Sequence, residues 1–226
     1  MDRFQYEPLD LTGRSFRLLM LHTASSGEIS CDIFQASLDP DVIIPYEALS
    51  YAWGNVELSA SITANGKSLR ITNNLITALS HLRHESMDRI MWIDAVCIDQ
   101  NNVAERGHQV GHMTGIYRGA EQVIIWLGSS TRETQLLMGC LKEFQQEWNR
   151  QKSPDDFAWA REQWSTQRQS SGLDQAVVDD LQQKGLASLL AQPWFTRIWV
   201  LQEVSNARTA PIYCGTCPAA SGASDT

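Results

Sequence analysis

The chain has 226 residues, of which 43% are hydrophobic and 19% are charged, a balance that is typical of a globular protein and excludes wholesale disorder. Its 26 acidic and 18 basic side chains give a net charge of −8, and the lack of any Lys/Arg run argues against a nucleic-acid partner, because such binding depends on clustered positive charge. The start has no basic-then-apolar signal pattern and no apolar stretch approaches the roughly 20 residues that span a bilayer, so we expect a cytoplasmic protein with no membrane span.

Strands dominate the N-terminal third of the sequence. Residues 15–24 and 29–38 are apolar segments separated by Ser-Ser-Gly-Glu, which predicts a hairpin. Asn65-Gly66, the preferred residue pair of a type I′ turn, lies between alternating apolar residues and predicts a second hairpin. The helix that begins after Thr72 has an apolar stripe at spacings of four and three, formed by Leu75, Leu79 and Leu82.

Strands and helices alternate in the middle of the chain. Residues 89–99 form an apolar run of strand length, suited to burial on both faces of a parallel sheet. Residues 100–120 follow as a helix and residues 121–130 as another buried strand; the predicted apolar face of the helix carries Val103, Val110, Met113 and Tyr117. This succession predicts an α/β fold with a parallel-core sheet flanked by helices, together with the two additional β-hairpins.

The C-terminal part of the chain is predicted to be mainly helical. Residues 149–172 are polar and rich in Gln and Ser, which indicates an exposed helical insertion, and two later helices are predicted to meet at Pro193. Residues 216–226 have the composition of a disordered tail. We therefore expect a single domain over residues 1–215, with its core motifs in residues 46–215.

Polar side chains follow the predicted strands at their carboxyl ends, where ligands gather in open α/β sheets. Tyr51, Trp53 and Gly54 end one strand, and Asp94 interrupts another, with Asp99 just beyond it. A carboxylate between apolar segments must meet an arginine, backbone donors or a ligand, because burying a lone charge is costly. Asp94 is therefore a candidate binding residue, and a structural ion pair or a helix cap is the alternative.

Glu203 is the second candidate carboxylate. It lies four residues after Trp199 in a predicted helix, which places both on one helix face. An indole beside a carboxylate suits a flat ring attached to a sugar, because the ring stacks while the carboxylate meets the sugar hydroxyls. The alternative is a surface glutamate on an amphipathic helix.

No metal site is expected. His108 and His112 have the i, i+4 spacing of a zinc-binding helix, but Gln109 stands where a metalloprotease has its general base. Cys214 and Cys217 form a lone Cys-x-x-Cys pair without a second ligand pair at the usual spacing. The five cysteines are odd in number and irregularly spaced, so we expect no disulfide framework either.

Three segments carry a resemblance to a known family. "ALSYAWG", "RIMWIDAVCIDQNNVAERGHQVGHMTGIYRGAEQVIIWLG" and "PWFTRIWVLQEV" occur in this order and closely resemble the fungal heterokaryon incompatibility (HET) domain over about residues 46–215. The resemblance implies a cytoplasmic domain that triggers programmed cell death when genetically different fungal cells fuse. It also implies self-association, or contact with other incompatibility proteins, as the partner interaction.

HET domains are in turn similar to TIR domains, which have a flavodoxin-like α/β fold and some of which cleave NAD. The catalytic glutamate of those TIR domains lies in a Trp-Cys-x-x-Glu motif, and Trp199-Val-Leu-Gln-Glu203 has the same spacing with Val200 in place of the cysteine. The resemblance thus implies a TIR/flavodoxin-like fold and a catalytic Glu203. It implies NAD or a related nucleotide as a substrate rather than a bound cofactor, with these binding residues: Tyr51, Trp53, Gly54, Asp94, Asp99, Arg197 and Trp199.

Two functional hypotheses remain open from the sequence. In the first, the protein is an NAD glycohydrolase in which Glu203 stabilises the ribosyl cation that forms as nicotinamide leaves. In the second, it is a non-catalytic signalling module that acts by self-association, and the motif residues only hold the fold together. An inert or regulatory truncated fragment is the third alternative.

Overall fold

A computed structural model describes residues 1–39, 44–55, 57–151, 175–215 and 217–218. The chain divides into two compact units. Unit 1 comprises residues 1–126 and 196–210, and unit 2 comprises residues 127–195 and 211–226. The predicted insertion at 149–172 lies outside the described residues from residue 152 onward, as does the predicted tail apart from Cys217 and Pro218. The expectation of a single domain stays a prediction.

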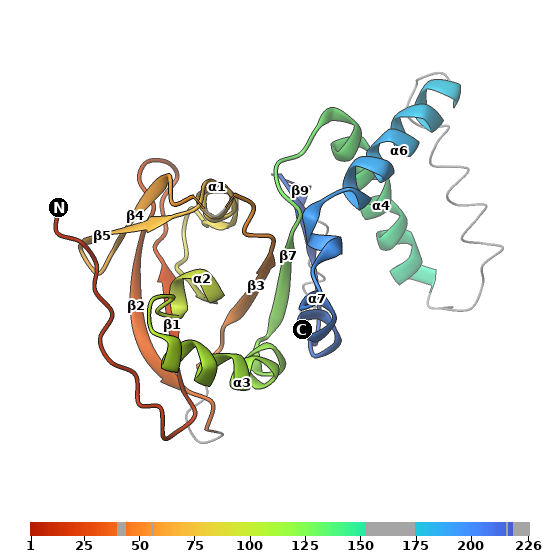
Figure 1. Ribbon diagram of the computed structural model, residues 1–226. Coiled ribbons are helices and arrows are strands. Elements are labelled where there is room, and N and C mark those ends of the chain that lie inside the picture. The colour runs from red at the N-terminus through yellow and green to blue at the C-terminus, as the bar shows by residue number, and fades with distance from the viewer. Residues whose placement is uncertain (40–43, 56, 152–174, 216, 219–226) are drawn as a thin grey trace. The chain divides into compact units, whose positions relative to one another are not determined.

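Unit 1 is built on a mixed sheet whose strands lie in the order β5-β4-β2-β1-β6-β3-β7 (Figure 1). Its strands are β1 Ser15–Leu21, β2 Ser30–Ser37, β3 Glu47–Tyr51, β4 Ala60–Ala64, β5 Lys67–Ile71, β6 Arg89–Trp92 and β7 Gln122–Trp126. Strand β3 runs parallel to both of its neighbours, β6 and β7. The predicted α/β class and its parallel core are thereby confirmed.

Both predicted hairpins are present. Strands β1 and β2 pair antiparallel along their whole length, and β4 pairs antiparallel with β5. The second turn is made by Asn65 and Gly66, with φ of 49° and 72°, the left-handed values that a type I′ turn requires. The Asn65 side chain also joins the hairpin to β2, because its Oδ1 accepts the Ile33 N–H at 2.6 Å and its Nδ2 donates to the Ile33 carbonyl at 3.0 Å.

Local sequence signals also set the first helix, α1, which spans Asn73–Leu82. The hydroxyl of Thr72 accepts the N–H of Leu75 at 3.3 Å and caps the helix start. The predicted stripe is buried as expected, and it comprises Leu75, Leu79 and Leu82, joined by Ala78.

The strand predicted over residues 89–99 is wrong in its second half. Strand β6 ends at Trp92, and the short helix α2 then spans Asp94–Cys97. The carbonyl of Ile93 accepts the N–H groups of Val96 and Cys97 at 3.0 and 2.7 Å, which closes a helical turn inside the apolar run. Apolar composition alone cannot separate a buried strand from a buried helical turn.

The predicted apolar face of the long helix α3, Val103–Gly119, is confirmed at Met113 and Tyr117 and is wrong at Val103 and Val110. Val103 and Val110 are exposed, and the buried side chains are Glu105, Gln109, Met113, Ile116 and Tyr117. Two of these are polar, and each finds a partner from the start of β1. Gln109 donates to the Ser15 carbonyl at 2.8 Å, and Glu105 pairs with Arg17. Figure 1 shows α2 and α3 on the same face of the sheet.

Arg17 and Glu105 form an ion pair in the interior of unit 1. The Arg17 Nη1 lies 2.5 Å from Glu105 Oε1, Nη2 lies 3.0 Å from Oε2, and the two side chains are only 3% and 2% exposed. The Glu105 carboxylate also accepts the N–H of Asp99 at 2.7 Å. Arg17 further donates to the carbonyls of Cys97 and Glu7. The pair therefore ties the N-terminal segment, α2 and α3 together.

Unit 2 consists mainly of two packed helices, α4 (Arg132–Gln151) and α6 (Gln175–Leu190), which lie side by side in Figure 1. The predicted break at Pro193 is present, since α6 ends at Leu190 and a 3₁₀ turn, η1, spans Pro193–Thr196. The short strands β8 (Ile212–Cys214) and β9 (Cys217–Pro218) pair antiparallel, so Cys217 and Pro218, which fall within the predicted tail, form a strand.

Replacing Gly185 by alanine is expected to destabilise unit 2 by about 1–3 kcal/mol, because the helices must separate to admit the methyl group. A Cβ on Gly185 would lie 2.6 Å from the Glu133 carbonyl oxygen and 3.2 Å from the Leu137 Cβ. Urea denaturation of both proteins measures the loss.

Gly139→Ala is the matched control on the partner helix. A Cβ at Gly139 meets no described atom within 4 Å, so this change should leave stability unchanged or raise it by up to about 1 kcal/mol, the helix propensity difference. Equal stability of the two alanine variants would show that α4 and α6 do not pack as described.

Candidate functional site

Glu203 is held inside unit 1 by residues from distant parts of the chain. It lies in the short helix α7, Val200–Ser205, and its side chain is 0% exposed. Arg197 Nη2 donates to Glu203 Oε1 at 2.8 Å and Nη1 donates to Oε2 at 3.3 Å. The hydroxyl of Ser50, on β3, donates to Oε2 as well. The glutamate is thus a buried carboxylate at the end of the parallel core, and the alternative of a surface glutamate is excluded.

Asp94 occupies the N-terminal position of α2 and is half-buried. The indole N–H of Trp53 is shared between its oxygens at 3.0 and 3.2 Å, and the N–H of Ala95 donates to Oδ1 at 2.7 Å. Burial raises the pKa of Asp94 from 3.8 to about 6 against these hydrogen bonds, and Arg197 lowers this pKa whereas Glu203 raises it. The charges of Asp94, Arg197 and Glu203 therefore act on one another within one cluster.

Two buried phenols, Tyr51 and Tyr117, lie close to these charged groups. We refer to the whole set as the acidic cluster, which comprises Ser50, Tyr51, Asp94, Tyr117, Arg197 and Glu203. Tyr51 is 1% exposed, and its hydroxyl has no hydrogen-bond partner among the described residues. Burial raises the pKa of Tyr51 well above its usual range, Asp94 raises it further and Arg197 lowers it. The pKa of Tyr117, on α3, is likewise raised by burial first and then by Glu203. Both phenols therefore stay neutral near neutral pH. Leaving the Tyr51 hydroxyl unpaired costs about 1–3 kcal/mol.

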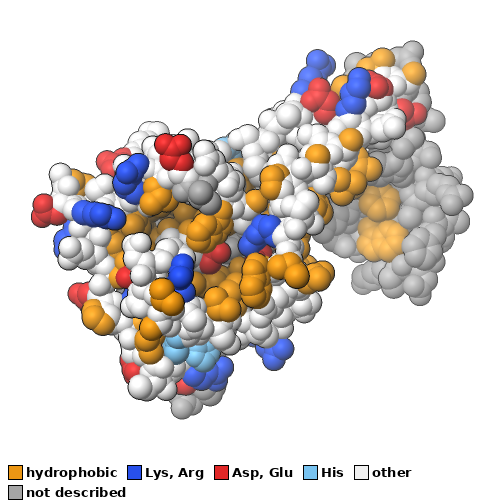
Figure 2. Space-filling view, in the orientation of Figure 1, with side chains coloured by type: hydrophobic (Ala, Val, Ile, Leu, Met, Phe, Trp, Pro, Cys, Tyr) orange, Lys and Arg blue, Asp and Glu red, His pale blue; other side chains and the backbone are white. Residues whose placement is uncertain are grey.

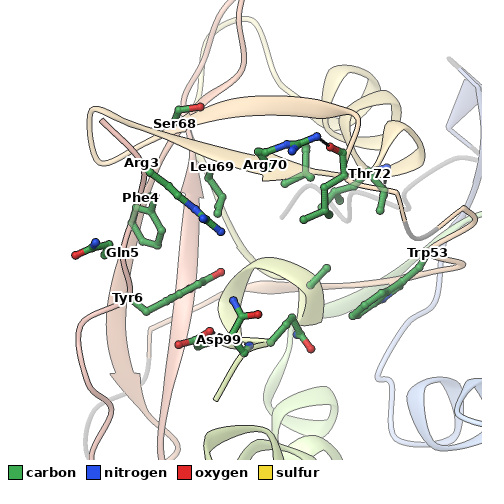
Figure 3. A pocket seen from close by; sticks show the side chains of 16 residues that line it. Arg3, Phe4, Gln5, Tyr6, Trp53, Ser68, Leu69, Arg70, Thr72 and Asp99 are labelled. Atoms are coloured by element: carbon green, nitrogen blue, oxygen red, sulfur yellow. Dashed lines mark hydrogen bonds between the residues drawn. The ribbon is translucent and has the colours of Figure 1, made fainter. Parts of the chain in front are cut away.

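A cavity of about 610 Å³ adjoins the cluster. The N-terminal segment, β5 and α2 form its walls, as Figure 3 shows. Trp53 connects the cavity with the acidic cluster, because its ring lines the cavity while its N–H donates to Asp94. Asp99 lines the cavity too, whereas Glu203, Tyr51 and Asp94 do not belong to its lining. Figure 2 shows a hollow bordered by hydrophobic side chains on this face of unit 1.

Two predicted site residues stand apart from the cluster. Gly54 is exposed and has a φ of 69°, so it serves the turn after Trp53. Trp199 is the residue before α7; its carbonyl accepts the Glu203 N–H at 3.0 Å, but its side chain is 47% exposed. No hydrogen bond joins its ring to the Glu203 carboxylate in the part of the chain that the structure describes. The paired arrangement expected from their spacing is therefore absent.

Ser50 and Tyr117 belong to the cluster but were not singled out from the sequence. Ser50 is a polar residue that follows the apolar Ala48 and Leu49 in β3, and that signal could have found it. Tyr117 was assigned to the core of its helix, which is correct for its burial. Its proximity to the carboxylates depends on the packing of α3, and no local pattern reports that.

The family follows from comparison with known proteins. The sequence profile of the family described as "Heterokaryon incompatibility protein (HET)" matches residues 46–203. The chain belongs to this family. The matched range of the HET domain begins beside β3 and ends at Glu203, so it contains the whole cluster from Ser50 onward. The predicted family resemblance is confirmed.

The HET domain is also similar to a curated fungal protein, "Heterokaryon incompatibility protein 6, OR allele" of Neurospora crassa. The two are 30% identical over 249 aligned residues, which cover 94% of this chain and 35% of the relative. The chain thus spans about a third of the length of the relative it matches. No solved structure matches the chain, and the likeness to TIR domains stays a prediction. None of the described helices is both long and apolar enough to cross a membrane.

Replacing Asp94 by asparagine is expected to stabilise the HET domain near neutral pH. With a pKa of about 6 against an ordinary 3.8, the folded state holds the Asp94 proton more tightly than the unfolded state. Stability therefore falls as pH rises from about 4 to about 6, and the loss is complete above that range. Asparagine cannot ionise, so the stability of the variant does not fall in this way. The difference in unfolding free energy between the variant and the wild type should therefore grow over this pH range by on the order of 1 kcal/mol.

Unfolding free energies of both proteins at several pH values check this expectation. Asp10→Asn is a control whose effect on stability should change with pH in the opposite direction. Hydrogen bonds from Thr12 lower the pKa of Asp10, so Asp10 stabilises the fold only when it is ionised. A constant difference between the Asp94 variant and the wild type from about pH 4 to about pH 7 would show that Asp94 carries no such cost.

Proposed function

We propose that this HET domain acts in heterokaryon incompatibility by hydrolysing NAD, with Glu203 as the catalytic carboxylate. The observation that supports the proposal most is the burial of Glu203 beside a second carboxylate, Asp94, whose pKa of about 6 lies near neutrality. A carboxylate with a raised pKa, such as Asp94, close to a cavity is typical of catalytic sites. The choice of NAD as the substrate rests on the resemblance of Trp199–Glu203 to the motif of NAD-cleaving TIR domains.

The proposed reaction breaks the bond between the ribose C1′ and the nicotinamide nitrogen. The bonding electron pair stays with that nitrogen, which neutralises the pyridinium ring, so the leaving group needs no proton. A buried carboxylate stabilises the ribosyl cation that remains, because charge interactions are strong where water is excluded. Water then attacks C1′, and its proton passes to Asp94, whose pKa of about 6 suits a general base.

Access to Glu203 requires Arg197 to move. The two side chains are paired, and Arg197 is the partner that reaches the surface, with 21% of its side chain exposed. A phosphate of the substrate can draw the guanidinium away from the carboxylate, because arginine binds phosphate in the same bidentate manner. Arg197 would then hold the substrate while Glu203 faces the ribose.

A second candidate function is a non-catalytic module that signals by self-association. Two observations favour it. Glu203 is fully paired, as a purely structural glutamate would be, and Ile198 and Leu201 are apolar yet 79% and 74% exposed. Apolar side chains gathered at the surface are typical of protein contacts.

Incubation of the purified protein with NAD, with nicotinamide release followed by chromatography, tests the first proposal. Release should scale with protein concentration and should fall below about pH 6, where Asp94 takes up its proton. No release at any protein concentration would overturn it. The second function predicts instead that cell death on overexpression is lost in an Ile198→Asp, Leu201→Asp variant that remains folded and no longer associates.

A further inference from the structure

The cavity of about 610 Å³ is built partly from residues outside the HET match. Arg3, Phe4 and Tyr6 line it, and all three precede the matched residues 46–203. The N-terminal segment is fixed there by backbone bonds, since the Phe4 N–H donates to the Ser68 carbonyl and the Ser68 N–H donates to the Asp2 carbonyl, both at 2.8 Å. The volume is within the range of about 300–1,000 Å³ that small-molecule sites occupy.

Two arginines that line the cavity, Arg3 from the N-terminal segment and Arg70 from β5, lack acidic partners among the described residues. In the described part of the chain, neither Arg3 nor Arg70 has a carboxylate within 4.0 Å. Arg70 donates to the Leu58 carbonyl, and Figure 3 shows the guanidinium of Arg3 directed into the cavity. In a protein with a net charge of −8, two guanidinium groups at one cavity provide a local site for a phosphate.

Aromatic rings hold fixed positions in the same cavity. The hydroxyl of Tyr6 donates to the Val96 carbonyl at 2.9 Å, and its ring lies edge-on to that of Phe4 with centroids 5.0 Å apart. Trp53 is fixed by its bond to Asp94 at the other end of the cavity (Figure 3). The Arg17 guanidinium lies over the Tyr6 ring, 5.0 Å from its centroid, so Trp53 is the ring that we expect to stack on a planar ligand at little entropic cost.

The remaining polar groups suit the edge of a heterocyclic base. Gln100 and Asn101 line the cavity after α2. The Gln100 amide nitrogen donates to the Asp94 carbonyl at 2.8 Å, which fixes the side chain in place. Side-chain amides carry both a donor and an acceptor, and so can pair with base edges.

We propose that this cavity binds a mononucleotide, with the phosphate on Arg3 and Arg70 and the base against Trp53. The site is separate from NAD hydrolysis, because Ser50, Arg197 and Glu203 do not belong to its lining. It gives the HET domain a ligand site that depends on the N-terminal segment. A bound mononucleotide would contact Trp53 and, through it, Asp94 of the acidic cluster.

Isothermal titration calorimetry with AMP tests the proposal, with adenosine and inorganic phosphate as the two partial probes. AMP should bind at one site, and each partial probe should bind at least about tenfold more weakly. An Arg3→Gln, Arg70→Gln variant should lose at least about tenfold in AMP affinity and retain its affinity for adenosine. Arg14→Gln, an exposed arginine outside the cavity, is the control and should bind AMP as the wild type does.

AMP binding should persist in Glu203→Gln, so the outcome is independent of catalysis. The proposal is overturned if AMP binds more weakly than about 1 mM, if the double arginine variant binds AMP as tightly as the wild type, or if either partial probe matches AMP. Thermal melting shows whether the variants are folded, and both arginines are exposed, so their replacement should not disturb the core.

Discussion

Nicotinamide release is expected to fall by about 10²–10³-fold or more when Glu203 is replaced by glutamine, because the ribosyl cation loses the negative charge that we propose stabilises it. The substitution keeps the shape of the side chain. Its amide oxygen, in the place of Oε2, can still accept from Ser50 and from Arg197 Nη1, whereas its amide nitrogen, in the place of Oε1, faces the donor Nη2 of Arg197. Arg197 is partly exposed, so its charge can reach water, and the fold should survive. Initial rates of nicotinamide release for the variant and the wild type give the size of this effect.

The pairing of Glu203 with Arg197 allows the structural and catalytic roles to be separated. Breaking a buried ion pair from one side leaves the other charge unpaired, so Glu203→Gln and Arg197→Gln should each cost stability, and the double variant should recover part of that loss. The double variant should stay inactive although part of its stability is regained, because it lacks both the proposed catalytic carboxylate and the arginine proposed to hold the substrate. Nicotinamide release that survives in Glu203→Gln, or that returns in the double variant, would remove the catalytic role from this residue.

Replacement of Glu105 by alanine is expected to cost about 3–5 kcal/mol of unfolding free energy, a large part of the total stability of an ordinary domain. Arg17 is 3% exposed, so its charge cannot reach water once the carboxylate is gone. The N–H of Asp99 loses its acceptor as well. Because Asp99 lines the cavity, the same change should weaken AMP binding. Urea denaturation measures the stability.

Asp180→Ala provides a matched control for this loss. Asp180 pairs with Lys184 on the surface, and the two side chains are 56% and 63% exposed. Such a surface pair contributes at most about 0.5 kcal/mol. A Glu105→Leu, Arg17→Met variant should be more stable than Glu105→Ala, since apolar residues of similar volume leave no buried charge. An equal cost for Glu105→Ala and Asp180→Ala would contradict the importance of the interior pair.

The elements predicted well from the sequence are those set by interactions between near neighbours. The Asn65-Gly66 turn forms because this pair accepts left-handed backbone angles, and α1 begins where Thr72 caps it. The buried face of α3 was predicted correctly at Met113 and Tyr117 but not at its polar residues, because those depend on distant partners. Glu105 and Gln109 are buried because Arg17 and the Ser15 carbonyl meet them from β1. Their partners lie 88 and 94 residues away, and helical periodicity does not report them.

The residues of the candidate site also fall into two groups, those that local sequence patterns indicate and those that depend on distant contacts. The family and the candidates Trp53, Asp94 and Glu203 could be recognised from the amino-acid sequence, because these residue types stand out against apolar surroundings. The burial of Glu203, the hydrogen bond that Ser50 donates to it from 153 positions away, and the cavity that the N-terminal segment closes beside Trp53 became visible in the folded chain alone. The physical reason is that the ionisation and contacts of a side chain depend on what surrounds it in space, which sheet order and helix packing fix.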